Sequence, residues 1–354
     1  MKLIPQLFTH EERPIGVALG DAHIRAVQLG GTATAATVIG FGQVDLPKAI
    51  FDAEGRADVE GLARLFENLL LRPSFGKFST RDVSINLPEG RCFVRLIHIA
   101  LMSDDEIAAA VPFEAESYIP VPIDQVYLDW QKIGESEGKI ALLLVASPKS
   151  YVDPILQSLH QAGVTPVAVE VESQGLARAL VAVGNTDAVL LADMKASATD
   201  LVMVQSGGIQ FTSTLSVAGS QITEAIATGL QVSQKDAEQI KATVGFANTE
   251  QYPNLKTLIL PVLESLVTEI KKVMVFHSQH STAKVNRLLF VGGWAGLAGL
   301  SEFVKSSLPE YPELEVTVGD PTVNVHVNLP PELAGTKVLP YAAALGLAMR
   351  NVTV

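Results

Sequence analysis

The sequence predicts an α/β fold of two related halves, with a small α/β unit inserted into the first half. Two apolar runs within residues 15–29 flank Gly20-Asp21, which is the pattern of a β-hairpin. A second strand-rich run at residues 188–215 repeats this pattern, which indicates an internal duplication. Between the two runs, from residue 93 onward, short strands and helices alternate again.

The first half is expected to continue with two more strands on either side of one helix. The strands are expected at residues 36–44 and 82–86, and the helix at residues 58–71. One face of this helix carries the apolar residues Leu62, Leu65, Phe66 and Leu69. A helix between strands indicates one layer of an α/β fold.

The inserted unit is expected to open with a strand at residues 94–99 and a helix. Ser103 and Glu106 have the spacing of a capping box, so the helix is expected to begin there. Pro112 is expected to kink this helix or to end it early, because an interior proline costs about 3 kcal/mol. The unit is completed by strands at residues 126–131, 139–147 and 167–171 and by a helix at residues 151–162.

The second half is expected to form a sheet first and helices afterwards. Its strands are expected at residues 188–193, 200–205, 209–215 and 288–291, and its helices at residues 221–230, 234–244 and 261–280. We therefore divide the chain into a first lobe at residues 1–92, the inserted unit at 93–166, a return to the first lobe at 167–186 and a second lobe at 187–354. A C-terminal helix near residues 340–350 is expected to pack on the first lobe.

The composition is that of an acidic globular protein. The chain of 354 residues is 48% apolar and 18% charged, which is enough to bury a sizeable core. Its 26 Lys and Arg against 38 Asp and Glu give a net charge of -12, which argues against nucleic acid as a partner. The single cysteine, Cys92, cannot form an intramolecular disulfide, and it is expected to be a small core residue.

The location of the protein is expected to be cytoplasmic. Residues 1–13 contain no apolar run of the kind that a signal peptide needs. The longest strongly apolar stretch, residues 140–146, is too short to cross a bilayer, which takes about 20 residues. Contact with a membrane is therefore expected to be made through a partner.

Residues 113–131 form the most specific motif. They read Phe-Glu-Ala-Glu-Ser-Tyr-Ile-Pro-Val-Pro-Ile-Asp-Gln-Val-Tyr-Leu-Asp-Trp-Gln. This segment resembles the PilM family of type IV pilus assembly proteins, which are relatives of FtsA and actin. Further matching segments follow in the family's order at residues 161–166, 237–241, 291–293 and 341–348. The resemblance spans nearly the whole chain and implies the actin-like, ribonuclease H-like fold of two lobes.

The resemblance also implies a nucleotide site between the lobes. In actin-like folds two glycine-bearing hairpins embrace the phosphates, and a Gly-rich loop passes under the adenosine. The implied nucleotide-contacting residues are Gly20, Asp21, Asp193, Lys195, Ser197, Thr199, Gly219, Glu238, Lys241, Gly292 and Gly293. Asp193 is the implied metal ligand, and ATP with Mg²⁺ is the implied cofactor.

Three residues depart from the family pattern at this site. Ala18 stands where an Asp is usual, so a carboxylate that helps to hold hydrated Mg²⁺ is missing. Lys195 stands where Gly is usual, and its side chain either obstructs the approach of a phosphate to the backbone or pairs with the phosphate. Trp294 replaces a small residue and either fills the adenine space or stacks on the base. Nucleotide and metal binding are therefore expected to be weakened, with weak ATPase activity at most.

Several of these residues also have a structural interpretation. Asp193 is either a carboxylate at a strand end or a nucleotide contact. Glu238 and Lys241 are either a solvated pair on a helix or a ribose contact. His23 is either a surface imidazole or a phosphate donor, and the acidic residues at 114–116 are either a solvated face or a partner surface.

By resemblance, the chain is expected to be a scaffold of a type IV pilus or a related secretion-type machine rather than an enzyme. It would hold the N-terminal cytoplasmic peptide of a PilN-like single-pass inner-membrane protein in a groove beside residues 93–166. Other subunits of the machine are expected as further partners, and self-association stays open. ATP, if bound, would favour the closed form of the lobes without turnover.

Two rival functions also stay open. An active ATPase or kinase would need a pair of metal-holding carboxylates and a base, and Ala18 argues against it. An FtsA-like filament that tethers the membrane directly would have a basic amphipathic helix at its C-terminal end, and residues 341–354 are not expected to form one.

Overall fold

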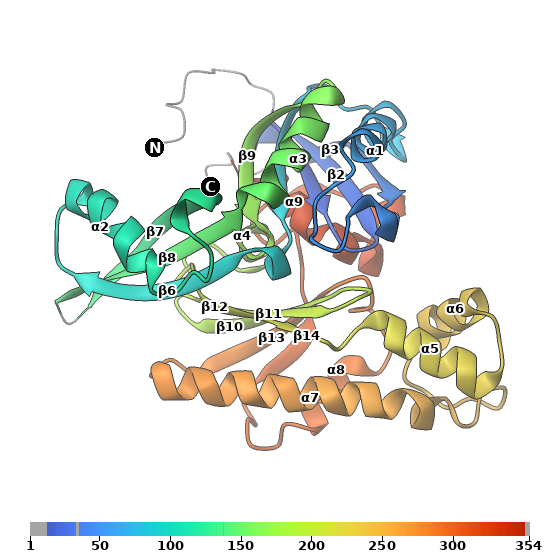
Figure 1. Cartoon of the computed structure of the whole chain (residues 1–354). Coiled ribbons are helices and arrows are strands. Elements are labelled where there is room, and N and C mark those ends of the chain that lie inside the picture. Colours follow the sequence, from blue (N-terminus) through green and yellow to red (C-terminus); the bar gives the residue numbers. More distant parts are fainter. Residues whose placement is uncertain (1–12, 33–34, 137, 351–354) are drawn as a thin grey trace.

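Three β-sheets organise the chain (Figure 1). The computed structural model describes residues 13–32, 35–136 and 138–350. A seven-stranded sheet forms the first lobe, a five-stranded sheet the second lobe, and a three-stranded sheet a small subdomain. Helices pack against these sheets, so the predicted α/β class is confirmed. The first twelve residues, in which no signal peptide is expected, lie outside the described residues.

The first-lobe sheet has the strand order β15-β3-β2-β1-β5-β9, and β4 pairs with β3. Its strands are β1 (Ile15–Leu19), β2 (His23–Thr32), β3 (Ala35–Asp45), β4 (Phe75–Gly76), β5 (Asp82–Leu87), β9 (Thr165–Val171) and β15 (Val327–Asn328). The predicted opening hairpin is confirmed, because β1 and β2 pair antiparallel with Ala18 opposite Arg25. β1 also pairs parallel with β5, which places the hairpin at the centre of the sheet.

Each face of the first sheet is covered by a pair of helices. Alternate residues of a strand point to opposite faces. The apolar residues Ile15, Val17 and Leu19 of β1 therefore join one core with α1 (Val59–Leu71) and α3 (Lys149–Gln161). On the other face, α4 (Glu172–Leu180) and α9 (Ala342–Ala348) pack together, and Ala18 faces them.

α9 packs on β1 and α4 through three glycines. A Cβ atom at Gly16 would lie 2.0 Å from the carbonyl oxygen of Ala344, and one at Gly346 would lie 1.8 Å from the carbonyl oxygen of Gly175. Both contacts are with backbone, which cannot rotate away as a side chain can. All residues of α9 are buried, so this helix belongs to the interior of the first lobe.

The small subdomain is shorter than the predicted inserted unit. Its sheet has the order β6-β8-β7, with strands β6 (Phe93–Ala100), β7 (Val126–Ser136) and β8 (Lys139–Pro148). The helix expected in the unit at residues 151–162 is α3, which packs in the first lobe instead. The strand expected at residues 167–171 is β9, and it pairs with β5 of the first lobe, to which the predicted return at residues 167–186 assigns it. α3 does not pack on the small sheet, because its apolar face is buried in the first-lobe core.

α2 (Asp104–Glu116) covers one face of the small sheet. Its capping box forms as predicted, since the Ser103 hydroxyl accepts the N–H of Glu106 and the Glu106 carboxylate accepts the N–H of Ser103 at 2.8 Å. Of the two effects predicted for Pro112, an early end of the helix is not observed. Val111 and Ala115 are fully buried against the sheet and hold the turns on either side of Pro112 in place.

The second-lobe sheet has the order β12-β11-β10-β13-β14. Its strands are β10 (Ala188–Met194), β11 (Thr199–Gln205), β12 (Gly208–Leu215), β13 (Val285–Gly292) and β14 (Glu315–Val318). Its helices are α5 (Gly219–Leu230), α6 (Gln234–Val244), α7 (Leu255–His280) and α8 (Leu300–Ser306). α7 runs along this sheet and begins before the predicted residue 261, so Pro261 lies inside it (Figure 1).

Short 3-10 helices and loops link these elements. The 3-10 helices are Lys48–Ile50, Glu89–Arg91, Ile123–Gln125, Pro331–Leu333 and Gly335–Tyr341. In the part of the chain that the structure describes, every helix is too short or too polar to cross a lipid bilayer.

The two lobes share one apolar core. Val27 and Leu29 of the first sheet pack in the same buried cluster as Leu191 and Val291 of the second sheet. The small subdomain reaches the second lobe as well, because Ile133 of β7 packs over Gly208 at the start of β12. The three sheets therefore form one continuous body.

We expect Gly16→Ala to lower the free energy of unfolding by at least 2 kcal/mol, because the new methyl group would overlap the backbone of α9. Gly90→Ala is the matched control, since a Cβ there meets nothing within 4 Å, and it is expected to change stability by less than 0.5 kcal/mol, a typical surface effect. Urea denaturation of both variants measures the difference. Equal stability of the two would contradict this packing of α9.

Candidate functional site

A pocket of about 200 Å³ lies between the two lobes. Its walls include the turn between β1 and β2, the turn between β10 and β11, the start of α5 and the loop after β13. The turns of the two hairpins meet at this cleft, since the carboxylate of Asp21 on the first turn accepts the N–H of Ser197 on the second.

Most of the predicted site residues line this pocket. They are Gly20, Asp21, Asp193, Lys195, Gly219, Glu238, Lys241, Gly292 and Gly293. Ser197 does not line the pocket and instead contacts Asp21. Thr199 lies away from the pocket, because its side chain is fully buried and its hydroxyl donates to the carbonyl of Val217 at 2.8 Å.

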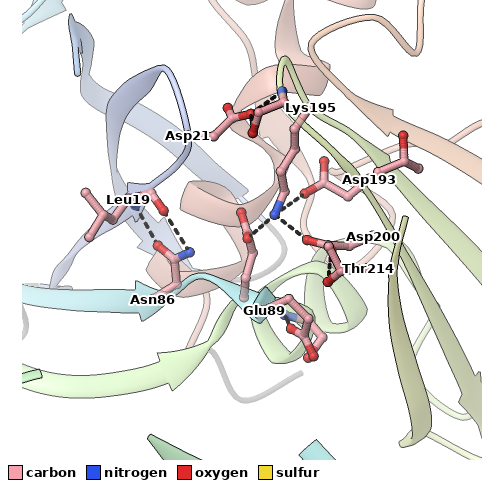
Figure 2. A network of polar contacts seen from close by, with 12 residues as sticks. Leu19, Asp21, Asn86, Glu89, Asp193, Lys195, Asp200 and Thr214 are labelled. Carbon is pink, nitrogen blue, oxygen red and sulfur yellow. Dashed lines mark hydrogen bonds and ion pairs between the residues drawn. The ribbon is translucent and has the colours of Figure 1, made fainter. Parts of the chain in front are cut away.

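Lys195 forms the centre of the site (Figure 2). Its Nζ atom lies 2.5 Å from Oε2 of Glu172, 2.5 Å from Oδ2 of Asp200 and 3.5 Å from Oδ2 of Asp193. The four side chains are at most 11% exposed. Glu172 is the first residue of α4, whereas the other three residues belong to the second hairpin. The buried ammonium group therefore joins the first lobe to the second.

Burial and neighbouring charges set the ionisation of this cluster. Burial by itself would lower the pKa of Lys195, but the carboxylates of Glu172, Asp193 and Asp200 outweigh it and hold that pKa well above its ordinary value. Burial raises the pKa of Asp193 to about 8, against the opposing effect of Lys195. Burial also raises the pKa of Glu172. Near pH 7, Lys195 is therefore an ammonium ion.

A second polar contact joins the two hairpin turns directly. Oδ2 of Asp21 accepts the backbone N–H of Ser197 at 2.5 Å and its hydroxyl at 2.6 Å. Asp21 follows the end of β1, and this end is held in place by β5. The N–H of Leu19 in β1 donates to Oδ1 of Asn86 in β5 at 2.6 Å (Figure 2). The first turn is thus anchored within its own sheet and bonded to the opposite lobe.

Trp294 packs into the wall of the pocket. Its indole is buried, and its N–H donates to the carbonyl of Lys195 at 3.1 Å. A Cβ atom at Gly219 would lie 2.8 Å from this ring, so Trp294 packs directly on the start of α5. Gly292, with φ of +95°, has no room for a side chain either, since a Cβ there would lie 2.5 Å from Oδ1 of Asp193.

Glu238 and Lys241 bind each other and the start of α5. Nζ of Lys241 donates to Oε2 of Glu238 at 2.7 Å, to the hydroxyl of Thr223 at 2.9 Å and to the carbonyl of Gly219 at 3.2 Å. Lys241 is buried and Glu238 is largely exposed. The interpretation of a solvated helical pair is therefore wrong for Lys241, whose ammonium secures α6 to α5.

Two further residues that the sequence singles out are Cys92 and His23. Cys92 lies outside the pocket and packs against the first-lobe core, where burial raises the pKa of its thiol to about 12. His23 is half-buried at the pocket wall, and burial lowers its pKa. Its Nε2 atom lies 3.4 Å from Oδ1 of Asp45.

Glu172 and Asp200 are site residues that sequence reasoning missed. The sequence pattern predicts no helix at residues 172–180, and it marks Asp200 only as the first residue of a strand. The register of the hairpin offered a signal, because Asp193 and Asp200 are paired across β10 and β11. A lysine between two such carboxylates could have indicated a buried ion cluster.

Glu89 is a buried carboxyl group next to this cluster (Figure 2). Its Oε2 atom accepts the backbone N–H of Ser173 at 3.2 Å, and its Oε1 atom has no hydrogen-bond partner among the described residues. Burial raises its pKa to about 7, and the nearby Asp200 and Glu172 act in the same direction.

The chain is similar to known proteins over almost its whole length. A model of the family described as type IV pilus assembly protein PilM matches residues 16–352. Among solved structures, a PilM-PilN type IV pilus biogenesis complex has 26% sequence identity and a TM-score of 0.81, with 98% of this chain and 100% of that chain covered. The resemblance that residues 113–131 indicated is therefore confirmed.

Two more distant structures share only the fold. The ethanolamine utilization protein EutJ from Carboxydothermus hydrogenoformans has 14% identity and a TM-score of 0.55, covering 98% of this chain and 91% of its own. MreB 5 of Spiroplasma citri, solved bound to AMPPNP, has 12% identity and a TM-score of 0.54, covering 97% of this chain and 96% of its own. The predicted actin-like fold of two lobes is confirmed.

The residues present do not fit the magnesium nucleotide that this fold implies. Oxygens of Glu172, Asp193 and Asp200 lie within 4.8 Å of one another, close enough to hold a cation, but the ammonium group of Lys195 lies among them. The N–H and hydroxyl of Ser197, which could bind a phosphate, are bonded to Asp21. The pocket of about 200 Å³ is also smaller than the roughly 300 to 1,000 Å³ of typical ligand pockets.

We expect Glu89→Gln to stabilise the protein at pH 8 and to have little effect at pH 4. Because the pKa of Glu89 is raised from 4.5 to about 7 on folding, the free energy of unfolding falls as the pH rises through this window. The full difference is about 3 kcal/mol. Urea denaturation across this pH range measures it, with exposed Glu67→Gln as the control. A gain that is independent of pH would show that charge is not its cause.

Proposed function

The chain belongs to the type IV pilus assembly protein PilM family, and from this premise we propose that it is a cytoplasmic scaffold that binds a peptide of an inner-membrane partner. The observation that carries the proposal is the match to the solved PilM-PilN complex, which extends over 98% of this chain. The proposed partner is a PilN-like single-pass protein, bound through its N-terminal cytoplasmic segment. The protein would then lie at the inner membrane without entering it.

We place the peptide groove beside the small subdomain. This subdomain, residues 93–148, presents several exposed large apolar side chains: Leu101, Phe113, Tyr118 and Tyr127. Phe113 on α2 is 74% exposed, the highest fraction among the large apolar side chains described. Aromatic residues are frequent anchors of protein interfaces, so the exposed ring of Phe113 is our candidate anchor for the peptide.

The edge strands of the small sheet, β6 and β7, carry backbone N–H and C=O groups that could pair with a peptide. Among the described strands, β6 and β7 each pair only with β8. An extended peptide can add to such an edge, gaining affinity from backbone hydrogen bonds and specificity from side-chain pockets. The net charge of -12 favours a peptide that carries basic residues.

Scaffolding of this kind requires no nucleotide turnover. Ala18 removes one carboxylate of the usual metal site, and Asp193, the proposed metal ligand, is bound to Lys195. Magnesium-dependent phosphate release that Asp193→Ala abolishes would instead support the rival ATPase function. We expect no such activity above background in a phosphate-release assay.

We expect a synthetic peptide of the partner's cytoplasmic segment to bind this chain saturably and Phe113→Ala to weaken binding at least tenfold, or about 1.4 kcal/mol. Loss of an aromatic anchor removes its buried area from the interface. Isothermal titration calorimetry measures both affinities.

Val183→Ala is the matched control, because this side chain is 69% exposed but lies after α4, outside the small subdomain. It should bind the peptide as the unchanged protein does. Saturable binding that Phe113→Ala leaves intact would refute the place of the groove. No binding at all would refute the partner.

A further inference from the structure

We propose that this chain supplies both ions of its own cleft: the ammonium group of Lys195 takes the place of a divalent cation, and the carboxylate of Asp21 takes the place of a phosphate. The lobes are thereby held together without magnesium nucleotide. The inference deepens the proposed scaffold function, since it explains how the cleft can stay closed without a ligand. Its test needs no partner peptide, so the two proposals can fail separately.

The three carboxylates of the cluster are close enough together to surround one cation. Oxygens of Glu172, Asp193 and Asp200 lie within 4.8 Å of one another. Opposite ligands of Mg²⁺ are about 4.2 Å apart and those of Ca²⁺ about 5 Å apart, given metal–oxygen distances near 2.1 and 2.5 Å. The spacing is therefore that of a cation site made of hard oxygen ligands.

Lys195 already fills this site. Its ammonium group has three N–H donors, and three carboxylates surround it. Asp200 is in turn fixed by Thr214, whose hydroxyl donates to Oδ1 at 2.5 Å. A hydrated divalent ion could enter only if this side chain left, which would expose a buried ion cluster to water.

The carboxylate of Asp21 occupies donors that could bind a phosphate. A backbone N–H and a hydroxyl at a tight turn are donors of the kind that bind phosphate oxygens. Here Ser197 offers both, and Oδ2 of Asp21 accepts both at 2.5 and 2.6 Å. Asp21 and Ser197 are far apart in the sequence and belong to opposite lobes. The link between the two turns that a bound phosphate would provide is here made by the Asp21 carboxylate.

The backbone of Lys195 is held by several hydrogen bonds. Its carbonyl accepts the indole N–H of Trp294 at 3.1 Å and the N–H of Gly219 at 3.0 Å, and its own N–H donates to the carbonyl of Ala198 at 2.9 Å. Trp294 is 4% exposed. The position of Lys195 in the cleft is therefore fixed by its backbone as well as by its ion pairs.

Manganese binding tests the cation. Electron paramagnetic resonance of Mn²⁺ in the presence of the unchanged protein should show no stoichiometric site. Lys195→Ala should gain one Mn²⁺ site, with at least tenfold tighter binding than the unchanged protein, and added Mn²⁺ should raise its melting temperature. The matched control is Lys241→Ala, because that buried lysine faces one carboxylate, Glu238, and its removal should create no site.

If Lys195→Ala does not fold, the double variant Lys195→Ala, Asp193→Asn leaves one less buried charge and should still bind Mn²⁺ more tightly than the unchanged protein. Stoichiometric Mn²⁺ binding by the unchanged protein overturns the proposal in every case. So does a Lys195→Ala protein that binds Mn²⁺ no better than Lys241→Ala.

Hydrogen exchange tests the anion. Asp21→Ala should speed exchange of the Ser197 amide at least tenfold, because its only described acceptor is removed. Asp45→Ala is the control, since this carboxylate near the same turn is 92% exposed and lies 3.4 Å from His23, not from Ser197. Unchanged exchange at Ser197 in Asp21→Ala would refute the role of Asp21, and equal acceleration in both variants would show a general loosening instead.

Discussion

A buried ammonium ion among three carboxylates constrains every element that meets at the centre of this molecule. Lys195 can stay charged there only while Glu172 from one lobe and Asp200 from the other lie within hydrogen-bond distance. Removing one member of such a cluster leaves uncompensated buried charge, which typically costs 3–5 kcal/mol. The relative position of α4 and the second hairpin is therefore fixed by electrostatics as well as by the apolar core that the lobes share.

The fold was largely predictable because its signals are local. The hairpin at residues 15–29 and α6, whose bounds match the prediction, rest on strand alternation, a turn and a capping residue, all of which are written in short segments. The family motif at residues 113–131 then placed these elements in one architecture. Pro261 shows the limit of local rules, since α7 begins before it and continues through it, although an interior proline normally breaks or kinks a helix.

The assignment of α3 to the first lobe was not predictable from local pattern. α3 follows the small unit directly in the sequence, so the predicted unit extends to residue 166. What decides the place of α3 is burial of Ile155 and Leu159 in the first-lobe core, beside the sheet in which β9 pairs with β5. Such contacts depend on residues far away in the sequence, and no periodicity encodes them.

The candidate site was predictable in its place but not in its chemistry. The resemblance marked Asp21 and Lys195 as residues that would face a ligand, yet each binds another part of the chain. Which side chains meet across the cleft depends on the docking of two lobes, and Glu172 enters only through that docking. The sequence shows that Lys195 stands where glycine is usual in the family, but it does not show which side chains Lys195 contacts.

The contact of Ile133 with Gly208 gives the small subdomain a mechanical link to the second lobe. A ligand that displaces β7 would disturb this contact with β12. Binding at the small subdomain would in that case change the position of a strand of the second lobe.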